Sequence, residues 1–343
     1  MATESRDKPR RIRNISELAK LAGVSAGTVS RALAGKDLVN RETRERIQAL
    51  AREHGFRPNQ MASRLRTGQT GVIGVVIPLG HDKRQHISDP FFMTLLGYLA
   101  DALTERGYDL MLSRVIPEHN DEWLERLVDS GMLEGVLMIG QSDQFAVIEQ
   151  VAAHYRPLVA WGVHQPGQVH CAVGTDNFTG GKLAAQHLLA QGRKRLAFFG
   201  DIRGIEIEER LKGARAAVAE AGTGANIELF ATPLATDNMA ERIAADLEAM
   251  DPAITGIFTA SDVIAMATLR QLHERGQQVP RDIALVGFDD LPLATQTVPQ
   301  LSSIHQQIGR GAEEMVSRLL RRIAGEETDS LVMEPRLIVR ESA

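Results

Sequence analysis

The feature that most constrains the fold is an alternation of short apolar runs with helix-length segments, which begins near Gly71 and continues through most of the chain. Residues 72–77 form a continuous apolar run, as expected for a strand that is buried on both faces of a sheet. Similar runs follow at 108–112, 135–139, 157–161, 196–199, 257–259 and 283–288. Helix-length stretches such as 95–106 and 182–191 lie between them. This order predicts parallel α/β units.

The stretch 71–343 is longer than one such sheet needs, since a domain usually has ~100–200 residues. We therefore expect two α/β subdomains with a ligand cleft between them. Each subdomain is built from two segments of the chain. We assign roughly 71–161 with 290–305 to one subdomain, and 162–289 with 306–343 to the other.

The residues before this region predict three short helices. Residues 14–17 have the pattern of a capping box at the start of the first helix. Ser25 is a good N-cap for a second helix, and Asn40 for a third, which ends at Gly55. The short gap at 22–25 is typical of the turn in a helix-turn-helix.

Charge is distributed unevenly along the chain, which the net charge of −5 conceals. Residues 1–69 carry 15 basic and 7 acidic side chains, a net charge of +8, whereas the remainder carries 24 basic and 37 acidic side chains, a net charge of −13. A basic head on an acidic body indicates a polyanionic partner for the head alone. A solvated, charged helix surface would give the same charges, so charge by itself leaves both interpretations open.

The strongest motif is residues 19–33, AKLAGVSAGTVSRAL. In a helix-turn-helix the second helix enters the major groove of DNA N-terminus first, so that end needs small or polar residues. Residues 25–28 are all small, and amides at a helix N-terminus favour phosphate. Arg31 lies one turn further along, where it could bind guanine O6 and N7 together. The alternative is a helical hairpin that binds no DNA.

The composition disfavours membrane, secreted and metal-binding proteins. No apolar run reaches the ~18 residues that a membrane span needs. Residues 1–14 are polar and basic and lack the apolar segment of a secretory signal. Cys171 is the single cysteine, so an internal disulfide or a thiolate metal cluster is excluded. We expect a cytoplasmic protein with no membrane contact, no metal and no cofactor.

One short motif also occurs at the active sites of hydrolases. Residues 23–27, GVSAG, fit the Gly-x-Ser-x-Gly pattern of a hydrolase nucleophile elbow. That elbow needs a strand before the serine, whereas the pattern here predicts a helix. The sequence also lacks a P-loop, a His-Glu-x-x-His motif and a Gly-rich dinucleotide fingerprint. We therefore predict that the chain is not an enzyme.

Motifs along the whole chain resemble those of the lactose-repressor (LacI/GalR) family of bacterial transcriptional regulators. Besides 19–33, the matching segments are VNRETR at 39–44, GFRPN at 55–59, ASRLRTG at 62–68, IGVVIP at 73–78, DPFF at 89–92, GTDN at 174–177, ASD at 260–262, VPRDIALVGFDD at 279–290 and PQLSSI at 299–304. They stand in the family's order, so the resemblance is highly specific. It implies an all-α helix-turn-helix headpiece at 1–58, a hinge helix and linker at 59–70, and a periplasmic-binding-protein-like effector and dimerisation domain at 71–343.

The resemblance also implies which residues contact DNA. Residues 59–66 look like a hinge helix that folds on the operator, and Leu65 matches the leucine that wedges into the minor groove. Such a wedge unstacks base pairs and kinks the duplex; the alternative for Leu65 is an ordinary helix contact. The DNA-binding residues that we predict are Ser25, Ala26, Gly27, Thr28, Ser30, Arg31, Asn40, Asn59, Ala62 and Leu65.

Candidates for an effector site lie at the ends of the predicted strands, because open α/β sheets bind ligands beyond the carboxyl ends of their strands. The candidates are Asp89, Phe91, Trp161, Arg210, Ser261 and Asp289. Arg210, Ser261 and Asp289 match ligand contacts of the family, whereas Phe91 and Trp161 could instead belong to the core. Gly162 departs from the family pattern, since many relatives carry an acidic or otherwise polar residue near there.

These observations predict a homodimeric DNA-binding regulator, most simply a repressor of carbohydrate-utilisation genes that binds a palindromic operator in double-stranded DNA. The effector is expected to be a neutral saccharide, with a glucose-type sugar as the best guess. A purine or nucleoside effector is the alternative within this class. The alternative from another class is a solute-binding protein, against which the basic head argues.

Overall fold

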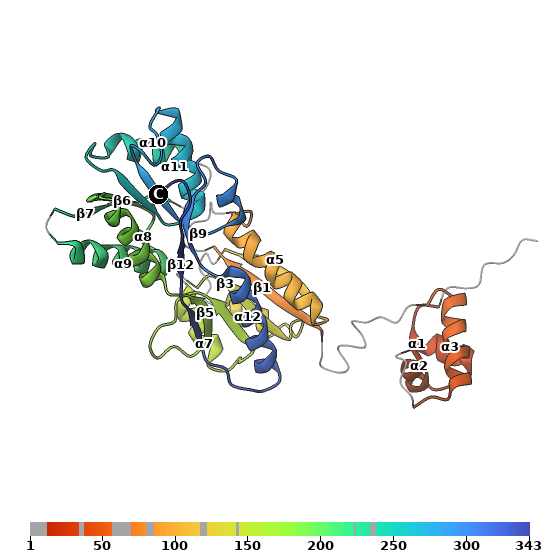
Figure 1. The fold of residues 1–343 in the computed structure, drawn as a ribbon. Coiled ribbons are helices and arrows are strands. Elements are labelled where there is room, and N and C mark those ends of the chain that lie inside the picture. The colour runs from red at the N-terminus through yellow and green to blue at the C-terminus, as the bar shows by residue number, and fades with distance from the viewer. Residues whose placement is uncertain are drawn as a thin grey trace, which may run out of the picture. The chain divides into compact units, whose positions relative to one another are not determined.

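The computed structural model describes residues 12–33, 38–56, 70–79, 86–116, 122–141, 144–222, 224–233 and 238–343. The chain divides into two compact units, 1–70 and 71–343 (Figure 1). The predicted hinge residues Asn59, Ala62 and Leu65 lie outside the described residues. Within the described ranges, no helix is both long enough and apolar enough to cross a membrane.

In its described residues, the first unit has the three helices that the sequence predicts for the head. Its helices are α1 (Ile15–Ala22), α2 (Ala26–Leu33) and α3 (Arg41–Glu53). They bury a small core of their own that includes Leu18, Val29, Ala32, Ile47 and Phe56.

Side-chain caps fix where these three helices begin. Asn14, Ser25 and Asn40 each accept a hydrogen bond from the backbone N–H three residues later, at 2.9, 3.1 and 2.8 Å. Such a bond satisfies one of the amides that a helix N-terminus leaves without a partner. Gly23 has φ of 65°, a left-handed conformation that glycine adopts without strain, and it ends α1. The tight turn between α1 and α2 follows from these local choices.

The second unit contains two six-stranded sheets. The first sheet has the order β11-β5-β4-β3-β1-β2, and its strands pair in parallel. Its strands are β1 (Val72–Pro78), β2 (Asp109–Val115), β3 (Gly135–Ile139), β4 (Leu158–Trp161), β5 (Cys171–Thr175) and β11 (Leu331–Met333). The helices of this subdomain are α5 (Pro90–Glu105), α6 (Trp123–Val128), α7 (Phe145–Ala152) and α12 (Ile308–Ile323).

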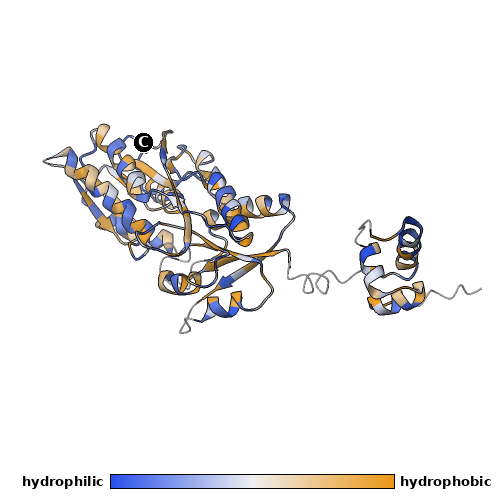
Figure 2. Cartoon of the chain, turned by 90° about the horizontal axis from the view of Figure 1, so that it is seen from below, coloured by the Kyte–Doolittle hydropathy of each residue, from blue (hydrophilic) through white to orange (hydrophobic). Residues whose placement is uncertain are grey.

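The second sheet has the order β12-β10-β9-β8-β6-β7 and is parallel except for β12, which pairs antiparallel with β10. Its strands are β6 (Arg195–Phe199), β7 (Asn226–Phe230), β8 (Gly256–Thr259), β9 (Ala284–Asp289), β10 (Ser302–His305) and β12 (Arg336–Ile338). The helices of this subdomain are α8 (Asn177–Ala190), α9 (Ile205–Ala221), α10 (Met239–Ala249), α11 (Asp262–Glu274) and the 3-10 turn η2 (Pro292–Thr295). The strands of both sheets are largely hydrophobic, whereas the helices mix hydrophobic and hydrophilic residues (Figure 2).

The pairing of strands corrects the predicted division into subdomains. Strand β5 pairs with β4 and so belongs to the first sheet, although 162–289 was assigned to the other subdomain. Strand β10 pairs with β9 in the second sheet, whereas α12 packs on β3, β4 and β5 of the first. The chain therefore crosses between the subdomains three times, after β5, after β10 and after β11. Apolar runs predict strands but not the sheet that each one joins, which explains the error.

Candidate DNA-binding and effector sites

Helix α2 separates the residues that hold the head together from those that can meet DNA. Val29 and Ala32 are buried in the core of the head. The predicted base-reading positions lie on the other faces of α2 or at its start, and are exposed or partly exposed: Ser25, Ala26, Gly27, Thr28, Ser30 and Arg31. The helix is thus held by one face and presents the opposite one, as the sequence predicts for a recognition helix.

Arg31 is the long side chain on this exposed face. Its Nε donates to the backbone O of Gly27 at 3.2 Å, one turn earlier. The terminal nitrogens of its guanidinium bond to no other described residue. Asn40 is also exposed; its Oδ1 caps α3, and its amide nitrogen is left for a further contact.

The Gly-x-Ser-x-Gly segment has no catalytic geometry. Gly23 ends α1 and Ser25 caps α2, so a helix and not a strand precedes the serine. The hydroxyl of Ser25 lies 2.9 Å from that of Thr28. A nucleophile elbow is therefore excluded.

The second unit contains a cavity of about 130 Å³ between its two subdomains, at the carboxyl ends of the parallel strands. All six predicted effector residues line this cavity: Asp89, Phe91, Trp161, Arg210, Ser261 and Asp289. Asp89, Phe91 and Trp161 come from the first subdomain and the other three from the second. A ligand in this place would contact both subdomains at once.

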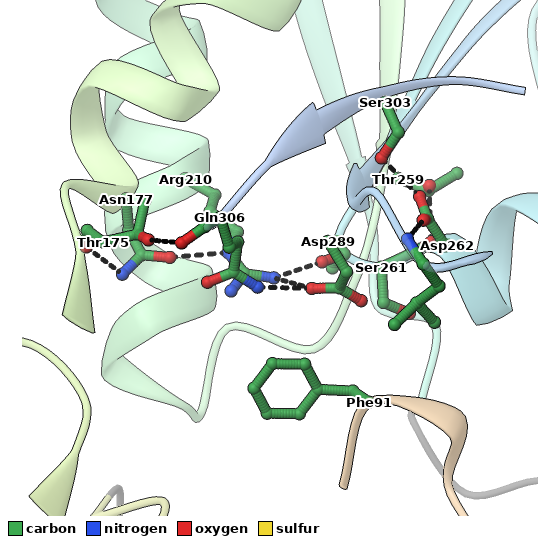
Figure 3. A network of polar contacts seen from close by, with 12 residues as sticks. Phe91, Thr175, Asn177, Arg210, Thr259, Ser261, Asp262, Asp289, Ser303 and Gln306 are labelled. Carbon is green, nitrogen blue, oxygen red and sulfur yellow. Dashed lines mark hydrogen bonds and ion pairs between the residues drawn. The ribbon is translucent and has the colours of Figure 1, made fainter. Parts of the chain in front are cut away.

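Arg210 of α9 is buried in the wall of the cavity and held by several neighbours (Figure 3). Its Nε donates to Oδ1 of Asn177 at 2.8 Å, and its Nη1 donates to the backbone O of Ala260. Its guanidinium lies 3.7 Å from the centre of the Phe288 ring, a cation–π contact. Burial lowers the pKa of Arg210, while Asp289 opposes that shift. The side chain is thus fixed before any ligand arrives.

Asp289 ends β9 and faces Arg210 across the cavity wall (Figure 3). Its Oδ1 accepts from Nε2 of Gln306 at 2.5 Å and lies 4.0 Å from Nη1 of Arg210. Its Oδ2 is buried and has no hydrogen-bond partner among the described residues. Burial raises the pKa of Asp289 to about 7, and the nearby Asp89 adds to that shift. A buried acceptor without a donor is costly, and a ligand hydroxyl could supply the missing hydrogen.

A second buried acid, Asp262, stands behind Asp289. Its Oδ1 accepts from the Ser303 hydroxyl at 2.6 Å and its Oδ2 from the backbone N–H of Leu291 at 2.8 Å. Burial raises the pKa of Asp262 well above its ordinary value, and the charge of Asp289 adds to that shift. Asp262 does not line the cavity; it ties the segment after β9 to β10 and α11.

Asp89 and Ser261 cap helices at the border of the cavity. Oδ1 of Asp89 accepts from the backbone N–H of Phe91 at 2.9 Å, at the start of α5. The Ser261 hydroxyl accepts from the backbone N–H of Ile264 at 3.3 Å, at the start of α11. As a cap, Ser261 uses its oxygen as an acceptor, which leaves its hydrogen for a ligand.

An aromatic wall closes the side of the cavity that the first subdomain forms. The ring of Phe91 lies 5.9 Å from the rings of both Phe92 and Trp161, centre to centre. Trp161 is only 5% exposed and packs closely on α12, where a Cβ added to Gly311 would come within 2.3 Å of the ring. Trp161 is therefore both a core residue and part of the cavity wall.

Several polar residues of the cavity are not among the predicted ones: Gln141, Asp201, Arg203, Glu206 and Gln306. Gln141 lies just beyond β3, so the rule that located the other candidates could have found it. Gln306 follows β10. The sequence does not predict this strand, because polar residues interrupt its apolar pattern. Asp201 and Arg203 lie in the turn after β6 and form an ion pair with each other.

Comparison with known proteins agrees with this architecture. Residues 14–59 match the bacterial regulatory proteins of the lacI family, and residues 185–343 match the periplasmic binding protein-like domain. The chain is 32% identical to the HTH-type transcriptional regulator CelR of Thermobifida fusca, over 97% of this chain and 99% of that protein. It is 30% identical to the ribose operon repressor of Halalkalibacterium halodurans, over 96% of each.

Solved structures give the same result. A complex of the transcriptional regulator CelR with cellobiose matches with a TM-score of 0.67 at 29% identity, covering 97% of this chain and 100% of that one. The lac repressor dimer bound to operator and the anti-inducer ONPF matches with a TM-score of 0.82 at 22% identity, covering 98% and 99%, which shows the fold. Because relatives of this identity match almost from end to end, the chain belongs to the lacI family of bacterial regulatory proteins and is a helix-turn-helix transcription regulator, not an enzyme.

Proposed function

We propose that this regulator is a cytoplasmic, homodimeric repressor of carbohydrate-utilisation genes. Its head, with the hinge segment at 59–70, binds a palindromic operator, and a neutral saccharide in the cavity between the subdomains changes its affinity for that operator. The observation that carries the effector proposal is the buried Oδ2 of Asp289, an acceptor on the cavity wall that has no hydrogen-bond donor among the residues that the structure describes.

The polar groups around this atom suit sugar hydroxyls. A hydroxyl both donates and accepts, and the cavity offers an acceptor at Asp289 and a donor at Ser261 beside the guanidinium of Arg210. The charges argue against an anionic ligand, because among the described residues four acidic side chains line the cavity and two basic ones. One of those two, Arg203, is paired with Asp201.

The size of the cavity favours a small sugar. At about 10–15 Å³ for each water-sized group, its volume of about 130 Å³ has room for roughly ten non-hydrogen atoms. That is close to one monosaccharide, in line with a glucose-type effector. Two relatives support a sugar as the ligand class: CelR has been solved with cellobiose, and another LacI-family regulator, from Enterococcus faecium, with ribose.

The chain topology supports a mechanism for control. A ligand changes DNA affinity only through its different affinity for two arrangements of the protein. Three connections join the two subdomains, and a ligand between them would favour one relative orientation. The first subdomain continues into residues 59–70 through β1, so a change of orientation could order or disorder the hinge segment.

The test is calorimetric titration of the full chain with D-glucose, D-ribose, cellobiose, adenosine, guanosine and glucose 6-phosphate. Binding of a neutral sugar, with a weaker or absent signal for the other compounds, is the expected result. Nucleosides are included because Phe91 and Trp161 could stack on a base. Tight binding of a nucleoside or of the phosphorylated sugar, with no heat from any neutral sugar, would overturn the saccharide proposal.

A further inference from the structure

A second polar cluster borders the same cavity on the side of the first subdomain, apart from the network around Arg210. Gln141 follows β3, lines the cavity and is buried. Its Oε1 lies 2.8 Å from Nε2 of His170, and its Nε2 donates to the backbone O of Val163. The amide of Gln141 therefore contacts Val163 at one end and the ring of His170 at the other.

His170 is in turn fixed from the other side of its ring. Its Nδ1 lies 2.6 Å from Oε1 of Glu149, whose carboxylate also accepts from the backbone N–H groups of Val169 and His170. Burial raises the pKa of Glu149, but these backbone bonds outweigh burial and hold that pKa below its ordinary value. Glu149 is thus ionised and can only accept, so Nδ1 of His170 carries a hydrogen.

Gly162 lies next to Gln141, and the amide of Gln141 fills the space that a side chain at position 162 would need. A Cβ added to Gly162 would lie 2.6 Å from both Cδ and Nε2 of Gln141. Gly162 has no positive φ, so a side chain is excluded by lack of space and not by the backbone. The amide of Gln141 cannot move aside without losing its bond to Val163 and, when the ring of His170 is protonated, its bond to that ring. A side chain at position 162 and Gln141 in its present place exclude each other.

We propose that Gln141 is a specificity-determining residue of the effector site and that His170 is its positioning residue. Position 162 has no side chain that could offer a polar group to a ligand. The amide of Gln141, just beyond the end of β3, offers one instead. An amide both donates and accepts and carries no charge, which fits a neutral ligand rich in hydroxyls. The inference rests on the proposed function, since it requires an effector in this cavity.

The hydrogens in this cluster make the positioning role testable. Three contacts run from Glu149 through His170 and Gln141 to Val163, and each needs one hydrogen. Gln141 supplies the one toward Val163, so the ring of His170 must supply the other two and must be protonated. A neutral ring keeps its one hydrogen for Glu149 and loses the bond to Gln141.

The pH at which this happens depends on the groups around the ring. Burial lowers the pKa of His170, Glu149 of α7 opposes that shift, and the charges of His164 and of Arg322 from α12 add to it. The ring therefore gains its second hydrogen only on the acid side of its ordinary pKa. Effector affinity should rise as the pH falls through that range.

The test uses the full chain and the compound, among D-glucose, D-ribose, cellobiose, adenosine and guanosine, that raises its melting temperature most. Calorimetry should give an affinity about tenfold lower for Gln141→Met than for the wild type. Gln150→Met, the same change at an exposed position of α7, should leave the affinity unchanged. If Gln141→Met does not fold, Gln141→Leu replaces it.

The role of His170 is read from the pH profile. His170→Gln keeps an N–H donor but cannot titrate, so the affinity ratio of wild type to His170→Gln should rise from pH 8 to pH 5. Asp289 also titrates, but it does so in both proteins, and its contribution cancels in the ratio. Gly162→Ala should weaken binding in the wild type and have little further effect when Gln141 is already alanine.

Each outcome bears on one part of the account. Equal affinities of wild type and Gln141→Met would overturn the specificity role, and a ratio independent of pH would overturn positioning by His170. Additive effects of the changes at positions 141 and 162 would contradict their mutual exclusion. A nucleoside as the best ligand refutes the saccharide proposal and leaves the test of Gln141 intact, whereas a panel in which no compound binds overturns both.

Discussion

Replacement of Asp289 by asparagine should stabilise the ligand-free protein and weaken effector binding. The free carboxylate is buried, its Oδ2 has no partner among the described residues, and its Oδ1 lies 4.0 Å from Arg210. Asparagine has nearly the same shape and imitates the protonated acid. The change therefore removes a buried charge that the free protein pairs incompletely.

The size of the effect follows from the pKa of Asp289, which is about 7 in the folded chain against an ordinary value of 3.8. The folded protein holds the proton more tightly than the unfolded chain, so stability falls as the pH rises from about 4 to about 7. A shift of about three pKa units corresponds to about 4 kcal/mol above that window. Because the pKa of Asp262 is raised as well and the two acids share this cost, we expect about 1–3 kcal/mol for Asp289→Asn alone.

The assay is the melting temperature of the full chain, without ligand, from pH 4 to pH 9. At pH 8 Asp289→Asn should melt higher than the wild type by about 2–4 °C per kcal/mol, and the two curves should converge near pH 4. Asp129→Asn, at an exposed position, is the matched control and should follow the wild type throughout. A variant that is less stable than the wild type at pH 8, or an unchanged slope between pH 4 and 7, would refute the reasoning.

Four further changes test other parts of the structure. Arg31→Ala should cost about 1–3 kcal/mol of operator affinity and relax specificity at one position in each half-site; fluorescence anisotropy with single-base operator variants measures this, and equal weakening on every sequence would instead indicate a phosphate contact. Arg210→Ala should abolish the effector response in calorimetry yet keep operator binding. The change leaves buried acceptors without a donor, which costs about 1–3 kcal/mol of binding free energy. Loss of DNA binding as well would contradict a role confined to the cavity. Gly213→Ala should destabilise the chain by about 3 kcal/mol, because its Cβ would lie 1.8 Å from the backbone O of Phe178 in α8. Gly97→Ala, at an open helical position, should instead stabilise it by up to about 1 kcal/mol in denaturant unfolding.

Several strands could be predicted because burial on both faces makes them continuous apolar runs, as in β1 and β9, although the predicted β2 is an edge strand with exposed and half-buried residues. The strands that escaped include β5, which is buried along its whole length. Others have different surroundings. In β7, at the sheet edge, several residues are exposed or half-buried. In β10 two serines are fully buried, and the hydroxyl of Ser303 bonds to Asp262, a contact that no local pattern reveals.

The residues of the candidate effector site also fall into those that the sequence could locate and those that it could not. Asp289 and Ser261 could be located because they lie at strand ends, where the topology gathers ligand contacts. Gln141 and His170 could not be connected, since their contact joins residues 29 positions apart and depends on the space beside Gly162. The sequence does mark Gly162 as a departure from the family pattern, but only the folded chain explains it.

A neutral saccharide should control how tightly this chain holds DNA. The most direct measurement is the affinity of the full chain, with and without saturating sugar, for an operator that it selects from random duplex DNA. We expect a palindromic operator and an affinity that changes at least about tenfold, a coupling free energy of about 1.4 kcal/mol. An affinity that no neutral sugar alters, or binding without any sequence preference, would contradict it.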